Sequence, residues 1–189
     1  MMKEKLIQKI REFQPCNEQE ATDKATMLAL LESGTDLAHR DNLLTHLTAS
    51  AWVVNPDRTK VLMAYHNLYD SWAWLGGHAD GEQDLAAVAQ REALEESGLE
   101  AVRLVTPKPI SVEILTVDGH EKRGRYVPSH LHLNVTYLFE ADPDAPLRSK
   151  PDENSAVAWI PIDRIEDYSS EPWFCRRIYS KLIAKASLV

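Results

Sequence analysis

Cysteine is scarce in this sequence: Cys16 and Cys175 are the only two among 189 residues. They lie far apart in the chain, and each lies in or beside a segment that we expect to be helical. The pattern therefore predicts two ordinary thiols rather than a disulfide framework. Their spacing also differs from that of a cysteine-based zinc site. Two unpaired thiols fit a reducing compartment, so we expect a cytoplasmic location.

Long apolar runs are also missing, and no run approaches the length of a transmembrane helix. The first ten residues, MMKEKLIQKI, are charged and lack the apolar core of a signal peptide. We therefore expect no membrane partner. With 44% hydrophobic and 26% charged residues, the composition is typical of a globular protein with one core and a small extension.

Positive charge is in short supply, because 21 Lys and Arg residues stand against 29 Asp and Glu residues and leave a net charge of -8. This balance argues against nucleic acid as the main partner. An acidic protein that handles phosphates needs metal ions together with a local cluster of basic side chains.

A glycine-rich loop leads into the clearest predicted helix. Asp84 is a good N-cap residue, and the residues after it are strong helix formers with no Gly or Pro before Gly98. The pattern therefore predicts a helix over residues 85–97 that follows the Gly76-Gly77 pair.

Three carboxylates gather on one side of this helix, because Glu92, Glu95 and Glu96 are spaced at i, i+3 and i+4. Glu92 and Glu96 fall within the apolar arc, and Glu95 lies at its edge. Carboxylates on a buried side repel one another and lose hydration, so their charge must be compensated. Mg²⁺ can provide this, since it prefers oxygen ligands and keeps positions for water and substrate phosphates. The alternative is an acidic helix that is simply exposed to solvent.

The segment from Gly77 to Leu99 resembles the signature of the Nudix hydrolases. That signature is Gly, five residues, Glu, seven residues, Arg-Glu, an aliphatic residue, any residue, Glu-Glu, any residue, Gly and an aliphatic residue. The matching residues are Gly77, Arg91, Glu92, Glu95, Glu96, Gly98 and Leu99, with Ala93 as a small substitute for the aliphatic residue. Gln83 stands where the signature has its first Glu, and Glu82 comes one residue early. In the family, that first Glu mainly supports the join between loop and helix.

The resemblance implies an α/β (α+β) fold, a Nudix-like α/β/α sandwich with a mixed sheet. It also implies a Mg²⁺-dependent pyrophosphohydrolase, with Mn²⁺ as an alternative ion, that cleaves a nucleoside diphosphate linked to another moiety. Glu92, Glu95 and Glu96 would bind the metal together with the carbonyl of Gly76, and one carboxylate would act as general base. Arg91 would hold a glutamate in place by paired hydrogen bonds. Nudix proteins are often dimers, so a homodimer is compatible with the resemblance.

Two other functions are compatible with the same residues. The first is a Nudix-fold nucleotide-binding or sensor module with weak or no hydrolysis, for which Gln83 is the indication. The second is an isomerase of isoprenoid diphosphates, which requires a cysteine near the cleft. Cys16 and Cys175 lie outside the strands expected to form the cleft, so this alternative is the weakest.

Two regions are predicted along the chain. Residues 1–40 are expected to form an N-terminal helical extension packed on the main domain, with two helices within 3–33 separated at Pro15 and Asn17. A dimer contact or a substrate-side lid are the other roles open to it. Residues 41–189 are expected to form the Nudix domain, with strands at 44–54, 60–65, 110–117, 130–140 and 156–160 and a last helix at 172–186.

Three histidines are candidate substrate contacts. His78 lies in the stretch from Trp74 to Gly81, which resembles a Nudix subgroup that reads Trp-x-Gly-Gly-His-x-Asp-Gly, and it either approaches substrate or stabilises the loop. His130 and His132 share the polar side of the strand 130–140, which we expect to face the cleft. A structural role is the alternative. A histidine pair at this spacing can also bind a transition metal, although only two nitrogens are visible.

Basic and acidic candidates lie outside the signature. Lys122, Arg123 and Arg125 form the densest basic cluster, in a segment (120–129) that we predict to be a long loop, and they are candidate phosphate contacts. Glu153 comes just before the strand 156–160. Some Nudix enzymes have an additional carboxylate in this region as a metal ligand or base, so the resemblance implies that role for Glu153. For both sets the alternative is a solvated loop.

Overall fold

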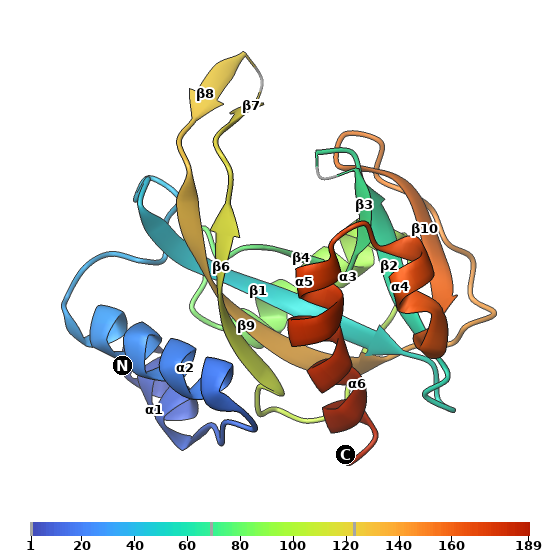
Figure 1. Cartoon of the computed structure of the whole chain (residues 1–189), viewed down its shortest axis with the longest axis horizontal. Coiled ribbons are helices and arrows are strands. Elements are labelled where there is room, and N and C mark those ends of the chain that lie inside the picture. The colour runs from blue at the N-terminus through green and yellow to red at the C-terminus, as the bar shows by residue number, and fades with distance from the viewer. Residues whose placement is uncertain (1, 69, 123) are drawn as a thin grey trace.

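The computed structural model describes residues 2–68, 70–122 and 124–189. In this part of the chain, α1 (Met2–Glu12) and α2 (Glu18–Glu32) come first, as the sequence predicts. Asn17 caps α2, because its side-chain oxygen accepts a hydrogen bond of 2.9 Å from the N–H of Glu20. Figure 1 shows both helices packed at one side of the sheet.

Within the described residues, eight strands form one curled sheet whose central order is β10-β2-β1-β9-β5. β3 pairs with β2, β4 with β1, and β6 with β9. The strands are β1 (Thr45–Val54), β2 (Lys60–His66), β3 (Ser71–Ala73), β4 (Leu75–His78), β5 (Arg103–Leu104), β6 (Ser111–Val117), β9 (His130–Glu140) and β10 (Asn154–Pro161).

The centre of the sheet is the pair formed by β1 and β9, which is parallel along its whole length. Its register runs from Thr45 opposite Leu131 to Val54 opposite Glu140. The other described pairs are antiparallel, so the sheet is mixed. A parallel pair needs a long connection, and here residues 55–129, which include β2 to β6, α3 and a short hairpin, separate β1 from β9.

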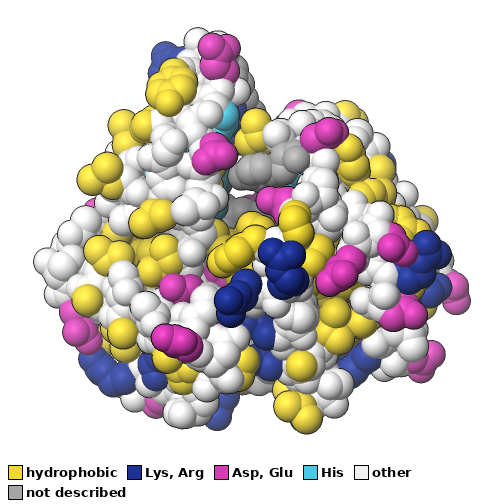
Figure 2. Space-filling view, in the orientation of Figure 1, with side chains coloured by type: hydrophobic (Ala, Val, Ile, Leu, Met, Phe, Trp, Pro, Cys, Tyr) yellow, Lys and Arg dark blue, Asp and Glu magenta, His cyan; other side chains and the backbone are white. Residues whose placement is uncertain are grey.

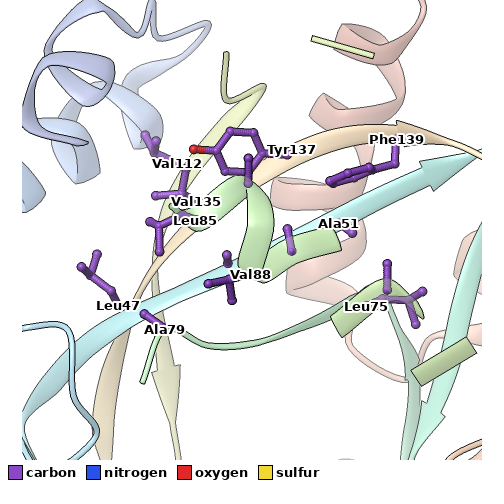
Figure 3. Close-up of a cluster of buried hydrophobic side chains, with 14 of the residues drawn as sticks. Leu47, Ala51, Leu75, Ala79, Leu85, Val88, Val112, Val135, Tyr137 and Phe139 are labelled. Carbon is purple, nitrogen blue, oxygen red and sulfur yellow. The ribbon is translucent and has the colours of Figure 1, made fainter. Parts of the chain in front are cut away.

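Helices cover both faces of the sheet (Figure 1). α3 (Leu85–Ser97), which has the predicted bounds, packs on one face, and Figure 3 shows Leu85 and Val88 against Leu47, Val135 and Tyr137. The C-terminal helices pack on the opposite face, over a cluster that includes Trp52, Leu138, Tyr179 and Leu182. They are η1 (Ile162–Arg164), α4 (Ile165–Tyr168), α5 (Pro172–Phe174), the π-helix η2 (Cys175–Tyr179) and α6 (Ser180–Ala186). The predicted α/β/α layering of an α+β fold is therefore confirmed.

The prediction of a long loop over residues 120–129 is wrong. Instead, β7 (His120–Lys122) and β8 (Arg125–Val127) form a two-stranded antiparallel hairpin that projects from the sheet (Figure 1). The strands are only three residues long and expose most of their side chains. Because neither strand buries an apolar side, the sequence carries no period-2 signal of a half-buried strand.

The N-terminal helices are joined to the rest of the molecule by apolar and charged contacts. Ile10, Met27 and Leu31 belong to the same buried cluster as the residues of the sheet and α3. Glu20 of α2 is fully buried and accepts a hydrogen bond of 2.6 Å from the Nζ of Lys185 in α6. Within the described ranges, no helix combines the length and apolar character that a membrane span requires.

Candidate functional site

The entry into α3 is fixed by two side chains. Asp84 is the N-cap and accepts a hydrogen bond of 3.2 Å from the N–H of Ala86. The carboxylate of Glu82 accepts from the N–H groups of Gln83 at 2.7 Å and Asp84 at 2.8 Å. Glu82 therefore supports the join between loop and helix, the role that the resemblance gives to the position of Gln83.

The three glutamates of α3 differ in exposure as the helical pattern predicts. Glu96 is buried, with 2% of its surface exposed, and accepts a hydrogen bond of 3.0 Å from the N–H of Gly76. Glu92 is half-buried and lies against Gly77, where a Cβ atom would be 2.5 Å from the Cδ of Glu92. Glu95 is exposed. Gly77 thus allows β4 to lie directly against the carboxylate of Glu92.

Burial disfavours the charged form of these carboxylates in the metal-free protein. Burial raises the pKa of Glu96 to about 8, and the nearby charges of Glu92 and Glu153 act in the same direction. Burial also raises the pKa of Glu92, although Arg91 opposes this by donating a hydrogen bond of 3.1 Å to its Oε1. A divalent cation would reverse both effects, because it favours the ionised carboxylates.

Lys150, which sequence reasoning missed, pairs with Glu95 and with a further carboxylate, Glu153, at the edge of this group. Its Nζ lies 3.1 Å from Glu95 and 3.0 Å from Glu153. Burial lowers the pKa of Lys150, but hydrogen bonds to Glu153 and Glu95 outweigh it, and the pKa is raised. The charge of Glu153 also acts on Glu96, so the structure brings Glu153 to the edge of the α3 glutamates.

Arg40 is a second basic residue that the sequence did not single out. Its guanidinium donates to both carboxylate oxygens of Asp80, with Nε at 2.7 Å from Oδ1. The hydrogen bond to Asp80 raises the pKa of Arg40, and the charges of Glu92 and Glu153 raise it further. Arg40 also lowers the pKa of His78 and of His132. The charge of Arg40 therefore interacts with both the acidic group and a group of histidines.

The predicted histidines do come together, and a fourth joins them. The ring centroid of His46 lies 5.0 Å from that of His78, 4.9 Å from that of His130 and 5.0 Å from that of His132. Burial lowers the pKa of His78 to about 3 and that of His132 to about 2. Sequence reasoning missed His46 because only the parallel pairing of β1 and β9 sets it opposite His132.

The remaining candidates lie on the hairpin. Lys122 is exposed and lies opposite Arg125 in the hairpin, and its charge contributes to lowering the pKa of His78. Arg125 is exposed near the tip, and Arg123 lies outside the described residues. Figure 2 shows the surface hollowed between this hairpin and the part of the molecule that carries β2, β3 and β10, with acidic side chains on both sides of the hollow.

The donor set of the α3 group fits a hard divalent cation. Glu92, Glu95, Glu96 and Glu153 offer carboxylate oxygens, the ligands that Mg²⁺ and Mn²⁺ prefer. Among the described residues, no basic side chain pairs with Glu96, although it is the most buried of the four. Gly76 lies in β4 with its N–H directed to Glu96, and metal binding by its carbonyl stays a prediction.

The protein has an α+β fold in which a mixed, curled sheet lies between helical layers. The acidic group lies on α3, the helix that follows the Gly76-Gly77 pair. The NUDIX domain model matches residues 44–181, and the chain therefore belongs to the NUDIX family. A comparison with curated proteins finds no significant match.

Solved structures of Nudix proteins share this fold at low sequence identity. A NUDIX family hydrolase from Clostridium perfringens is 19% identical with a TM-score of 0.50, and the match covers 76% of this chain and 97% of that one. The Nudix hydrolase RenU from M. smegmatis is 17% identical with a TM-score of 0.55, covering 76% and 87%. The E. coli dihydroneopterin triphosphate pyrophosphohydrolase is 13% identical with a TM-score of 0.51, covering 73% and 94%.

Proposed function

We propose that this protein is a Mg²⁺-dependent pyrophosphohydrolase, with Mn²⁺ as an alternative ion, that cleaves a nucleoside diphosphate linked to another moiety. Family membership supports the general reaction. The observation that carries the proposal is Glu96, a carboxylate with 2% exposure whose described partner is a backbone N–H and not a basic side chain. A buried charge without a counterion is costly, so a cation in this position explains the cluster.

Each residue of the site has a defined task in this reaction. Glu92 and Glu96 would hold the cation, and Glu95, which is paired with Lys150 here, would be a further ligand. Arg91 positions Glu92 through its hydrogen bond of 3.1 Å. A bound Mg²⁺ stabilises negative charge on the phosphoryl oxygens and lowers the pKa of the attacking water. One carboxylate of the group would accept a proton from that water as its oxygen bonds to one phosphorus, and the bridging P–O bond then breaks, so that the two halves leave as separate phosphates.

The decisive variant is Glu96→Gln, which keeps the shape of the side chain and removes its charge. We expect hydrolysis in Mg²⁺ to fall by at least about 100-fold while the protein stays folded, because a ligand of the cation is lost. Release of nucleoside monophosphate and thermal unfolding are measured side by side. Glu100→Gln, an exposed glutamate just beyond the helix, is the matched control and should retain full activity. Full activity in Glu96→Gln would refute the proposal.

The substrate is best found with a panel of diphosphates assayed in Mg²⁺ and in Mn²⁺. The panel contains dinucleoside polyphosphates, nucleotide sugars, NADH-like dinucleotides, ordinary and oxidised nucleoside triphosphates and capped RNA ends. These substrates differ in the groups that the protein must contact, and residues other than the fixed positions of the signature make those contacts. His78, His130, His132 and Arg125 are our candidates for contacts to phosphate, sugar or base, and Arg123 is a further candidate.

Lys150 supports a second candidate, a nucleotide-binding or sensor module with weak or no hydrolysis. Its ammonium already pairs with Glu95 and Glu153, so part of the acidic group is neutralised without a metal ion. This candidate predicts tight nucleotide binding in metal-free calorimetry and no turnover in Mg²⁺ or Mn²⁺. Measurable turnover of any member of the panel decides in favour of the hydrolase.

The expected setting of the reaction follows from the same residues. We infer a cytoplasmic location, which the two free thiols Cys16 and Cys175 support. The partner is a small nucleoside diphosphate derivative rather than nucleic acid or a membrane. A homodimer is compatible with the family, and sedimentation or light scattering of the purified chain measures it directly.

A further inference from the structure

The histidines His46, His130 and His132 bring their ring nitrogens together in a way that the hydrolysis of a diphosphate does not require. One nitrogen of each ring lies within 4.8 Å of the corresponding nitrogens of the other two. His46 is 4% exposed and His130 is 8% exposed. The three side chains come from two neighbouring strands, because β1 and β9 lie side by side in parallel at the centre of the sheet (Figure 1).

Backbone carbonyls orient two of these rings. The Nδ1 of His46 lies 3.0 Å from the carbonyl oxygen of Asn42, and the Nδ1 of His130 lies 2.8 Å from that of Pro128. A carbonyl can only accept, so both Nδ1 atoms carry the proton and both Nε2 atoms keep a free lone pair. Metal-binding histidines commonly have this arrangement, in which the second ring nitrogen donates to a carbonyl.

One of these lone pairs, on the Nε2 of His46, is buried and has no hydrogen-bond partner among the described residues. The other, on the Nε2 of His130, accepts a hydrogen bond from the Nε2–H of His132 at 3.2 Å, and a metal ion would replace that proton. In a tetrahedral site with Zn–N bonds of about 2.0–2.1 Å, two ligand nitrogens are about 3.3 Å apart. The separation of His130 and His132 is therefore close to that of two ligands of one ion.

We propose that His46, His130 and His132 form a binding site for a divalent transition-metal cation of the Zn²⁺ class, separate from the carboxylate site at α3. Three neutral imidazoles suit Zn²⁺, Cu²⁺, Ni²⁺ or Co²⁺ and suit Mg²⁺ poorly, because imidazole nitrogen is a softer ligand than carboxylate oxygen. The fourth position stays open for water or a substrate oxygen.

The surroundings of the site support an ion that remains accessible. The ring centroid of His78 lies 5.0 Å from those of both His46 and His132, so a fourth imidazole borders the three histidines. His132 is only half-buried, and the ring centroid of His120 at the start of β7 lies 6.4 Å from that of His130. The three histidines therefore lie near the base of the hairpin that forms one side of the hollow in Figure 2.

Titration of the protein without a histidine tag tests the site directly. The chain is kept in excess Mg²⁺, which occupies the carboxylates, and Zn²⁺ is added in competition with a chromophoric chelator. We expect one tightly bound Zn²⁺ per chain. Co²⁺ in place of Zn²⁺ is expected to give the visible absorption of a four-coordinate site with nitrogen ligands. Absence of binding for Zn²⁺, Co²⁺, Ni²⁺ and Cu²⁺ overturns the proposal.

Variants assign the ligands. His46→Gln and His132→Gln should each weaken Zn²⁺ binding by more than about tenfold, since each removes one of three ligands. His39→Gln is the matched control, because His39 is an exposed histidine paired with Asp36, and Glu96→Gln controls for the carboxylate site. Both controls should bind Zn²⁺ as the wild type does. Unchanged binding in His46→Gln and His132→Gln overturns the assignment.

A second measurement covers the case in which a histidine variant fails to fold. Zn²⁺ added to the wild-type chain in excess Mg²⁺ should raise the unfolding temperature, since an ion that binds only the folded state stabilises it. The half-exposed His132 makes His132→Gln the variant best able to fold, and its unfolding temperature should not respond to Zn²⁺. An equal rise in wild type and His132→Gln contradicts the proposal.

Discussion

The carboxylate of Glu82 stabilises the turn before α3, because it accepts hydrogen bonds from two consecutive backbone N–H groups. We expect Glu82→Ala to lower the free energy of unfolding by about 1 kcal/mol, because both groups lose a charged acceptor at a helix N-terminus. Urea unfolding of the metal-free chain measures this. Gln83→Ala is the control and should change stability by less than about 0.5 kcal/mol, since the side chain of Gln83 takes no part in these two bonds. If Gln83→Ala lowered the free energy of unfolding more than Glu82→Ala, Gln83 rather than Glu82 would support the join between loop and helix.

At the same scale, helical spacing was enough to identify Glu92, Glu95 and Glu96 and to rank their exposure. It could not identify Lys150 or Arg40. Lys150 contacts Glu95 across 55 residues and Arg40 contacts Asp80 across 40, and a contact at such distance is set by the fold rather than by local periodicity. His46 was not identified as a site residue for the same reason, because a single histidine on a strand does not indicate which residues it will contact in the fold.

Among the elements, those with a strong period were predicted well. The helix 85–97 and the strand 130–140 have the predicted bounds, because the first has clear caps and the second alternates over its whole length. The C-terminal helix was predicted as continuous over 172–186, and the structure contains the π-helical segment η2 within that range. The β7–β8 hairpin was missed because its short strands are largely exposed.

The exposed hairpin leads to a prediction about substrate binding. Arg125 is exposed on β8, in the hairpin that forms one side of the hollow. If it contacts a substrate phosphate, Arg125→Ala should raise KM by about threefold to tenfold with kcat nearly unchanged, because the contact contributes equally to substrate and transition state. The unfolding temperature should stay constant. Arg177→Ala removes an equally exposed arginine from the C-terminal helices and should leave KM unaltered. An equal rise in KM for both variants would show that the loss of one positive charge, rather than a specific contact of Arg125, weakens substrate binding.

For the molecule as a whole, a buried ionic network joins the two ends of the chain to the sheet. Glu20 of α2 lies 3.3 Å from the Nζ of Lys181 and 2.6 Å from that of Lys185, and Lys181 lies 3.0 Å from Glu113 of β6. Burial raises the pKa of Glu20, but the hydrogen bonds from Lys185 and from the N–H of Cys16 outweigh it and hold the pKa below its ordinary value.

This network predicts a pH-dependent loss of stability. The contribution of Glu20 is fully present above its unfolded-state pKa of about 4.5 and is lost as the pH falls through its lower folded-state pKa. Glu20→Gln should therefore cost about 3 kcal/mol at pH 7, where it removes the carboxylate that pairs with Lys185 and with the buried Lys181, and clearly less near pH 3. Urea unfolding at both pH values measures the difference. The exposed Glu18→Gln should cost little at either pH, and a constant cost for Glu20→Gln would contradict the linkage.

Neither this network nor the pairing of the central strands was visible in the sequence. A buried lysine such as Lys181 reads as an ordinary surface residue of a helix, since lysine is seldom buried without a partner. The order of strands depends on which edges meet, and the pattern of a single strand does not show its neighbours across long connections such as that between β1 and β9. What it did predict at this scale was the mixed sheet and the layering, through the resemblance.

The parallel pairing of β1 with β9 also bears on how the chain is made. One edge of β1 is completed only by residues 131–140, so during synthesis it has no permanent neighbour there until most of the chain has left the ribosome. His46 meets His132 at the same late moment. The nascent protein must therefore keep a strongly apolar strand soluble for most of its translation, and it acquires its central sheet and its histidine cluster in one step.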